Sequence, residues 1–128
     1  LKDIEDSIAS AANYINKIGW KKNEPCYLKI TLKDNVPKKY LNSSAKKIKN
    51  HAKIKKLKKF IKNYENYNLS ENILSAIIIP DKDIIPNSQS LSPAFLVFRN
   101  YELILKWNRS LRFALAVCTL KNKIKNEI

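Results

Sequence analysis

The sequence predicts an α+β fold, in which helices at both ends of the chain flank a small, mainly β segment. Apolar residues recur at helical spacing over residues 3–18 and again over residues 110–123. Between them, Tyr27–Leu32 alternates apolar and polar side chains as a half-buried strand does, and the apolar runs 77–79 and 95–98 have the character of buried strands. A chain of 128 residues, 45% of them hydrophobic, can bury one core.

The first helix, residues 3–18, has recognisable signals at both ends. Asp3 or Asp6 can cap its start, and Gly19, the only glycine in the chain, follows the last apolar residue of the period. Helices often end at a residue in the left-handed conformation, which glycine adopts without steric cost. We therefore expect Gly19 to end this helix and Trp20 to make the accompanying apolar contact.

The middle of the chain is rich in lysine. Residues 44–64 predict a helix, and nine lysines lie between Lys46 and Lys62 with no acidic residue among them. The apolar side of this helix comprises Ile48, Ile54, Leu57 and Ile61. A lysine-rich helix either binds a polyanion or presents a solvated outer face, and the second interpretation is the simpler one.

The carboxyl end combines a short helix, a polar corner and an apolar helix. Loop residues 80–93 precede the last strand, and the short helix is predicted over residues 100–106. Trp107-Asn108-Arg109-Ser110 then forms the polar corner before the last helix. Backbone N–H groups without intrahelical partners gather where a helix begins, so such a corner is suited to binding a ligand.

The formal net charge of +14 raises the question of a nucleic-acid partner. Lysine supplies 22 of the 25 basic residues, whereas proteins that read bases favour arginine, whose planar group matches guanine and phosphate. The excess of Lys, Asn and Ile is typical of an A+T-rich genome. We therefore expect no nucleic-acid partner, although attraction to an anionic polymer or a membrane surface is physically reasonable.

The potential metal ligands are few and scattered. Cys26, Cys118 and the single histidine, His51, do not form the four-ligand pattern of a zinc site, so we expect neither a metal nor a cofactor. Both cysteines lie in apolar surroundings and are most simply small core residues. A Cys26–Cys118 disulfide is the alternative in an oxidising compartment.

Two blocks near the ends of the chain carry a further signal. The first block contains Ser10-Ala-Ala-Asn-Tyr14, Gly19-Trp20 and Glu24-Pro25. The second contains Phe95-Leu-Val-Phe-Arg-Asn-Tyr101, Ile104-Leu-Lys-Trp-Asn-Arg-Ser110 and Phe113-Ala-Leu-Ala-Val117. In this order and at about this spacing, the blocks resemble the carboxyl-terminal portion of the membrane-bound lytic murein transglycosylase B family. Residues 35–75 match that family only loosely.

The resemblance implies a two-part layout and an activity. Residues 1–24 and 100–128 would be helical pieces of a lysozyme-like catalytic domain, and residues 25–99 a small, mainly β insertion that carries the Lys-rich helix. The enzyme would be periplasmic, with association with the outer membrane as a further expectation, and would act on the glycan strands of peptidoglycan. Such enzymes cut between N-acetylmuramic acid and N-acetylglucosamine and leave 1,6-anhydromuramoyl ends.

Position by position, the resemblance assigns four substrate-binding residues. Tyr14 matches a tyrosine that lines the glycan cleft, and Trp107 and Asn108 match a pair at its floor. Phe113 matches an aromatic position that is usually tyrosine, so the ring is kept and the hydroxyl is lost. In the alternative interpretation the two later aromatics are core residues, and Asn108 or Ser110 is only a helix N-cap.

The catalytic acid of the family has no counterpart in this sequence. The family uses a single glutamate in a glycine-containing motif, and none of the six glutamates here has that context. The resemblance therefore implies that the acid lies upstream of Leu1, in a missing N-terminal catalytic segment, and that the isolated chain is inactive. The terminal helices should then expose more apolar surface than is usual.

A second hypothesis needs no catalysis. The Lys46–Lys62 helix would make the chain a basic module that binds nucleic acid or an anionic envelope polymer, with an affinity that falls steeply as salt rises. The two hypotheses depend on different residues, because only the first requires Asn108.

Overall fold

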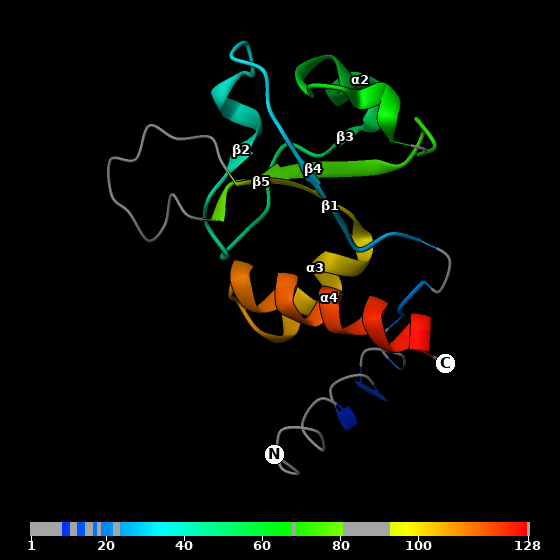
Figure 1. Ribbon diagram of the computed structural model, residues 1–128. Helices are drawn as coiled ribbons and strands as arrows, with labels where there is room; N and C mark the ends of the chain where they lie inside the picture. Colours follow the sequence, from blue (N-terminus) through cyan, green and yellow to red (C-terminus); the bar gives the residue numbers. More distant parts are fainter. Residues whose placement is uncertain are drawn as a thin grey trace.

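A mixed β-sheet with helices on both faces forms the centre of the molecule. The computed structural model describes residues 9–10, 13–14, 17, 19–21, 24–67, 69–80 and 93–127. The short helix α2 (Ile54–Leu57) lies on one face of the sheet, and α3 (Arg99–Trp107) and α4 (Leu111–Glu127) lie on the other (Figure 1). The α+β class expected from the sequence is confirmed.

The sheet is built around two apolar strands. Its order is β1 (Tyr27–Ile30), β5 (Ala94–Val97), β4 (Leu74–Ile78) and β2 (Leu41–Asn42), and β3 (Ala52–Lys53) also pairs with β4. β5 is antiparallel to both β1 and β4, whereas β2 is parallel to β4. The structure contains the three strands predicted from the sequence. It adds β2 and β3, which are two residues long and too short to show a period.

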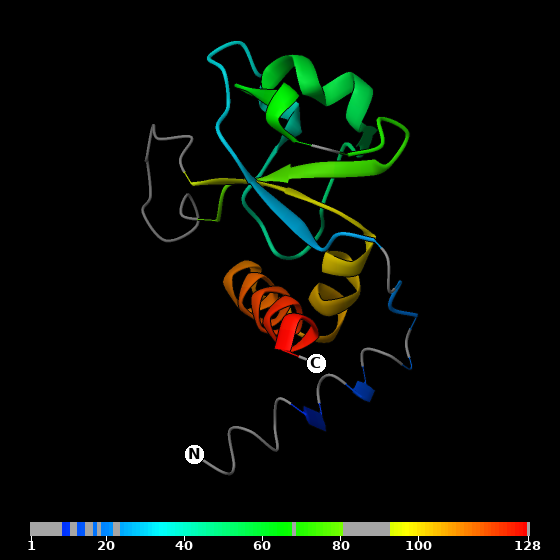
Figure 2. The same cartoon turned by 45° about the vertical axis from the view of Figure 1, so that its right-hand side comes forward.

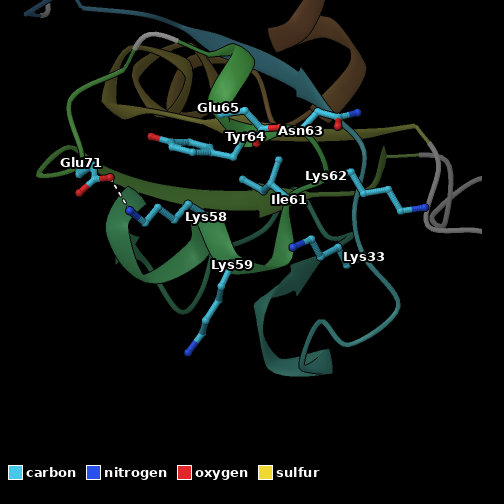
Figure 3. Close-up of a pocket in the computed structure, with 9 residues that line it drawn as sticks. All are labelled: Lys33, Lys58, Lys59, Ile61, Lys62, Asn63, Tyr64, Glu65 and Glu71. Carbon is cyan, nitrogen blue, oxygen red and sulfur yellow. Dashed lines mark hydrogen bonds and ion pairs between the residues drawn. The ribbon is translucent and has the colours of Figure 1, made fainter.

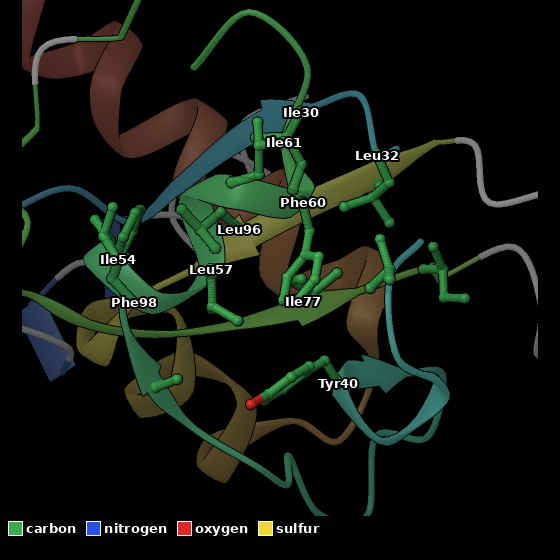
Figure 4. Packing of buried hydrophobic residues seen from close by; sticks show 14 residues of the cluster. Ile30, Leu32, Tyr40, Ile54, Leu57, Phe60, Ile61, Ile77, Leu96 and Phe98 are labelled. Atoms are coloured by element: carbon green, nitrogen blue, oxygen red, sulfur yellow. The ribbon is translucent and has the colours of Figure 1, made fainter. Parts of the chain in front are cut away.

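Both faces of the sheet are buried, which explains its uninterrupted apolar runs. Successive side chains of a strand point to opposite faces. On β4, Ile77 belongs to the core on the α2 side, and Ile78 belongs to the core under α3 and α4. On β5, Leu96 and Val97 divide in the same way. Figure 4 shows the first core, to which Leu57 of α2 contributes.

The prediction of a helix over residues 44–64 is wrong. Between residues 44 and 63, only α2 and the 3-10 turn Lys58–Phe60 that follows it are helical. The buried side chain of Asn42 organises the preceding loop, because its Nδ2 donates to the Lys49 carbonyl at 3.1 Å and its Oδ1 accepts from the Lys49 N–H at 2.9 Å. Asn50 then takes a left-handed conformation (φ 59°), which a right-handed helix does not contain.

The apolar residues of this segment are nevertheless buried. Ile54, Leu57 and Ile61 join the core on the α2 side, whereas Ile48 joins the core under α3 and α4. One face of a single helix cannot serve two cores that lie on opposite faces of a sheet. The spacing of these residues therefore indicated burial correctly and helix incorrectly.

The N-terminal helix ends where the sequence predicts. Of the helix expected over residues 3–18, residues 9, 10, 13, 14 and 17 lie in the described part, and all are helical. Gly19 follows with a φ of 113°, in the region that favours glycine. Trp20 packs against the core under α3 and α4. The rest of this helix, and most of the loop predicted over residues 80–93, lie outside the described residues.

The segment after this helix is bound to the start of α3. Buried Asn100 accepts a hydrogen bond from the Lys21 N–H at 2.8 Å and donates to the carbonyls of Lys21 at 2.8 Å and Glu24 at 3.1 Å. Arg99 adds an ion pair with Glu24. Residues 79 positions apart are thereby adjacent, and Figure 2 shows the two segments approaching each other.

The two C-terminal helices match their predicted positions within a few residues. α3 and α4 correspond to the helices expected over residues 100–106 and 110–123. They pack against each other and against the sheet. Within the described part of the chain, no helix combines the length and the apolar character that crossing a bilayer requires.

The two cysteines form a disulfide. Cys26 precedes β1, Cys118 lies in α4, and their Cα atoms are 5.9 Å apart. Both are buried in the core under α3 and α4, as expected of small core residues. They are not free thiols, however, so the disulfide alternative describes them. The bond joins the residue before β1 to the last helix, α4.

Candidate functional site

Three predicted aromatic residues meet at one corner of the molecule. The rings of Tyr14 and Trp107 have centroids 6.0 Å apart, and those of Trp107 and Phe113 have centroids 5.7 Å apart. The three residues come from the N-terminal helix, the last position of α3 and the first turn of α4. We call this group the aromatic corner. Its members are far apart in sequence, so only the fold brings them together.

Much of the aromatic corner is exposed. Tyr14 is 47% exposed and Trp107 is 45% exposed, whereas Phe113 is partly buried. Trp107 is therefore not a core residue. Leu120 of α4 is also exposed. Large apolar side chains therefore reach solvent on both α3 and α4.

Local hydrogen bonds fix the turn between α3 and α4. α3 ends where the Asn108 N–H donates to the Ile104 carbonyl at 3.0 Å. The Ser110 hydroxyl accepts from the Phe113 N–H at 3.2 Å, which makes Ser110 the N-cap of α4. The N-cap interpretation is therefore right for Ser110 and does not apply to Asn108. The capping bond also holds Phe113 beside Trp107.

Tyr101 is a positioning residue that the sequence did not single out. Its hydroxyl, buried in α3, donates to the Leu111 carbonyl at 3.0 Å and so joins α3 to the first turn of α4. Burial raises the pKa of Tyr101 well above its usual range, so the hydroxyl remains a donor at any physiological pH. The sequence did carry a signal for this role. Tyr101 occupies an apolar position of the helix predicted over residues 100–106, and a buried tyrosine hydroxyl needs a hydrogen-bond partner.

Asn108 presents an amide beside the aromatic corner. The residue is exposed and has an extended backbone (φ −139°, ψ 115°) at the end of α3. Within the described part of the chain, its side chain makes no hydrogen bond. A side-chain amide offers both a donor and an acceptor, so this group can bind a ligand that has hydroxyl or amide substituents.

A basic pocket of about 310 Å³ lies next to this corner. Its cationic lining residues are Lys46, Lys47, Lys106 and Arg109. Arg109 donates to the Lys46 carbonyl at 3.3 Å, which joins the loop before β3 to the turn after α3. The pocket also contains Glu102, whose carboxylate lies 2.7 Å from the His51 ring nitrogen. Sequence spacing gave no sign of this pocket, because the lysine loop is distant from α3 along the chain.

The titratable groups of the described residues do not assemble a metal centre. No group of three or more His, Cys, Asp or Glu side chains comes together among them. The chemistry available at the corner is therefore that of aromatic faces, one amide and nearby cations.

Comparison with known proteins places the chain in a family. The model of the family described as the transglycosylase SLT domain matches residues 1–122. No curated protein matches the chain significantly.

Two solved structures resemble this fold over 94% of the chain. One is SltB3 from Pseudomonas aeruginosa in complex with NAG-NAM-pentapeptide, with 26% identity and a TM-score of 0.64. The other is SltB3 in complex with NAG-anhNAM-pentapeptide, with 23% identity and a TM-score of 0.65, a likeness of fold alone. The present chain spans 30% of the length of SltB3.

Proposed function

The chain belongs to the transglycosylase SLT domain family, and from this premise we propose that it is part of a lytic transglycosylase acting on peptidoglycan. The proposed reaction cleaves the bond between N-acetylmuramic acid and N-acetylglucosamine and leaves a 1,6-anhydromuramoyl end. The observation that carries the proposal is the meeting of Tyr14, Trp107 and Phe113 at an exposed corner. The NAG-containing ligands of SltB3 support it.

The aromatic corner has the chemistry of a glycan-binding surface. Sugar rings present C–H faces that pack on aromatic planes, and Tyr14 and Trp107 offer such planes to solvent. The Asn108 amide can bond to hydroxyl and acetamido groups of the same sugar. Phe113 contributes a ring without the hydroxyl of a tyrosine, so its part is limited to apolar contact.

We infer that this chain binds glycan and does not itself supply the catalytic acid. A glutamate that protonates a glycosidic oxygen needs an apolar pocket that keeps it protonated. Glu24 and Glu71 form ion pairs instead, and Glu102 lies within hydrogen-bond distance of the His51 ring. Glu65 is exposed. The acid would come from a further catalytic segment, the partner implied by the family resemblance.

The disulfide supports a location in the periplasm. Disulfides persist in oxidising compartments, which include the bacterial periplasm, and are rare in the cytosol. Cys26 and Cys118 are bonded and buried, so the bond belongs to the core of the fold. Peptidoglycan, the proposed substrate, would be met in the same compartment.

The alternative of a polyanion-binding helix loses its structural premise. The Lys46–Lys62 segment is mostly not helical, and its lysines line two different pockets. Lys46 belongs to the pocket beside α3, whereas Lys62 belongs to a pocket beside α2. A continuous polyanion groove along one helix is therefore not formed.

Calorimetric titration with NAG-NAM-pentapeptide at about 150 mM salt tests the glycan-binding proposal. Trp107→Ala should weaken binding about tenfold, because it removes an aromatic contact of about 1–2 kcal/mol. Asn108→Ala should weaken binding about fivefold through the loss of one hydrogen bond. Leu74→Ala is the matched control, because Leu74 is a similarly exposed apolar residue (57%) on β4.

One result would contradict the glycan-binding proposal, and a second would contradict only the inference that the catalytic acid lies outside this chain. Binding that survives Trp107→Ala and Asn108→Ala but disappears at 500 mM salt would indicate a basic module instead. Release of 1,6-anhydro products from purified peptidoglycan by this chain alone, measured by mass spectrometry, would show that the acid is present in it.

A further inference from the structure

Tyr14 reaches the aromatic corner from the N-terminal helix, whose described residues have little burial. All five of them are exposed: Ala9, Ser10, Asn13, Tyr14 and Lys17. Gly19 follows the helix and adds no packing, because a Cβ placed on it would meet no heavy atom within 4 Å beyond its chain neighbours. Burial of these residues therefore does not fix the direction of the helix. The placement of Tyr14 beside Trp107 depends on how the segment after Gly19 is held.

Asn100 holds this segment by three hydrogen bonds. Its Oδ1 accepts from the Lys21 N–H at 2.8 Å, and its Nδ2 donates to the carbonyls of Lys21 at 2.8 Å and of Glu24 at 3.1 Å. The Lys21 carbonyl also accepts from the Glu24 N–H at 3.2 Å, as in a β-turn. Hydrogen bonds depend on direction, and the fully buried Asn100 amide has no water competing for them. The turn therefore has one orientation relative to α3.

Two other contacts of this segment are weaker or less directional. Arg99 forms an ion pair with Glu24, but the two side chains are 59% and 31% exposed, and exposed ion pairs contribute little. Trp20 packs against the core under α3 and α4, and the Lys121 ammonium lies 5.3 Å from its ring centroid. Apolar packing of this kind tolerates sliding, because the hydrophobic effect has no preferred direction. Asn100 is therefore the group that sets the angle of the segment.

A small rotation at Lys21 produces a large displacement at Tyr14. The two residues are seven positions apart, and seven residues of helix span about 10 Å. Over that length, a rotation of about 20° would move the Tyr14 ring by about 3 Å. The ring centroids of Tyr14 and Trp107 are 6.0 Å apart, and aromatic pairs interact at about 4.5–7 Å. Such a rotation would therefore open the aromatic corner.

We propose that Asn100 is a positioning residue for glycan binding, which holds the segment after the N-terminal helix so that Tyr14 stands beside Trp107. This role rests on the proposed glycan-binding function of the aromatic corner. Asn100 is fully buried and acts through Tyr14 without touching the ligand. Trp107 and Phe113 do not depend on it, because α3 carries the first and the N-cap of α4 holds the second.

NMR measurement of nuclear Overhauser contacts between the Tyr14 and Trp107 rings, without ligand, tests the positioning directly. The parent chain should show these contacts, and Asn100→Ala should lose them. Asn100→Asp keeps the size of the side chain and should lose them too, because a carboxylate cannot donate to the two carbonyls. Contacts between Trp107 and Phe113 should persist in both variants and show that α3 and α4 are folded. Tyr14–Trp107 contacts of parental strength in Asn100→Asp would overturn the proposal.

Calorimetric titration with NAG-NAM-pentapeptide measures the consequence for binding. Tyr14→Ala and Asn100→Asp should each weaken binding about fivefold, because each removes the Tyr14 ring from the sugar. The double variant should also bind about fivefold more weakly than the parent, since both substitutions remove the same contact. Losses that multiply to about twenty-fivefold would overturn the proposal, because Asn100 would then act by a route independent of Tyr14.

Three control variants separate positioning from a general loss of stability. Arg99→Gln removes only an exposed ion pair and should change the affinity by less than about twofold. Ser75→Ala removes a buried hydrogen bond of 3.1 Å between β4 and β3. Glu71→Gln breaks the ion pair with Lys58 in the pocket beside α2, away from the aromatic corner (Figure 3). The last two should leave both the ring contacts and the affinity unchanged.

The positioning role and the proposed function can fail separately. A parent chain that shows the Tyr14–Trp107 ring contacts but binds no glycan would refute the proposed function, and the ring contacts would still decide whether Asn100 positions Tyr14. A parent chain that binds glycan through Trp107, with an Asn100→Asp variant of equal affinity, would refute the positioning role alone.

Discussion

Asn100 joins the start of α3 to the segment before β1. Its side chain is fully buried and satisfies three backbone groups of the segment that precedes β1. A buried amide with all its partners specifies a single geometry, whereas a truncated one leaves those partners unpaired. In the sequence, Asn100 was part of a family motif and had no assigned role.

Asn100→Ala should lower the free energy of unfolding by about 2–4 kcal/mol, because three hydrogen bonds are lost and their partners become unsatisfied. Urea denaturation measures the change. Asn108→Ala is the matched control and should change stability by no more than about 0.5 kcal/mol, since its side chain is exposed. Equal effects of the two substitutions would refute the role given to Asn100.

Tyr64 and Tyr67 form a second matched pair at the residue scale. Tyr64→Phe should raise the free energy of unfolding by about 1 kcal/mol, because it removes a buried hydroxyl that has no partner among the described residues. Tyr67→Phe should lower it by about 0.5–1 kcal/mol, because the Tyr67 hydroxyl donates to the Lys29 carbonyl at 3.3 Å. Thermal unfolding followed by circular dichroism distinguishes the two signs. A loss of stability in Tyr64→Phe would mean that its hydroxyl is satisfied in solution.

At the scale of elements, the buried strands were predictable from the sequence and the conformation of the Lys-rich segment was not. The apolar runs that became β4 and β5 are buried on both sides, so their strand character is visible in any short window. The helix prediction for the Lys-rich segment failed because Ile48 and Ile54 belong to cores on opposite faces of the sheet, which one helix cannot serve. In addition, Asn42, just before the segment, holds its loop through hydrogen bonds to Lys49 that no spacing of apolar residues indicates.

The N-cap of α4 provides a test at this scale. Ser110→Ala should lower the free energy of unfolding by about 1 kcal/mol, because the Phe113 N–H loses its acceptor. Ser110→Asn keeps a capping oxygen and should restore most of the loss. Urea denaturation measures both, and an Ser110→Ala variant as stable as the parent would contradict the cap.

At the scale of the whole molecule, the disulfide closes a very long loop. Cys26 and Cys118 are 92 positions apart, and crosslinks that close long loops restrict the unfolded chain most. Reduction should therefore lower the free energy of unfolding by about 2–4 kcal/mol. Urea denaturation with and without reductant measures this, and the double variant Cys26→Ala, Cys118→Ala should match the reduced protein. Identical midpoints would show that the bond is not formed.

The candidate site was predictable in its residues and not in its arrangement. Family resemblance pointed to Tyr14, Trp107, Asn108 and Phe113, and the structure brings the three aromatic rings of this set together. Their roles in glycan binding stay predictions. The two basic pockets were invisible in the sequence, because each joins segments that meet only through a fold-specific contact. For the pocket beside α2 that contact is the Leu32–Ile61 bridge.

The points where the chain enters and leaves the sheet are neighbours. The Phe98 N–H donates to the Cys26 carbonyl at 3.2 Å, and Tyr27 pairs with Val97 across β1 and β5. Everything from residue 27 to residue 97 is therefore a closed excursion that returns to its origin. Such an excursion can be exchanged for another sheet only if the replacement offers α3 and α4 the same apolar face, because Ile78 and Val97 belong to the core under these helices. The geometry gives protein engineers a natural site for grafting, with both cut ends in one place.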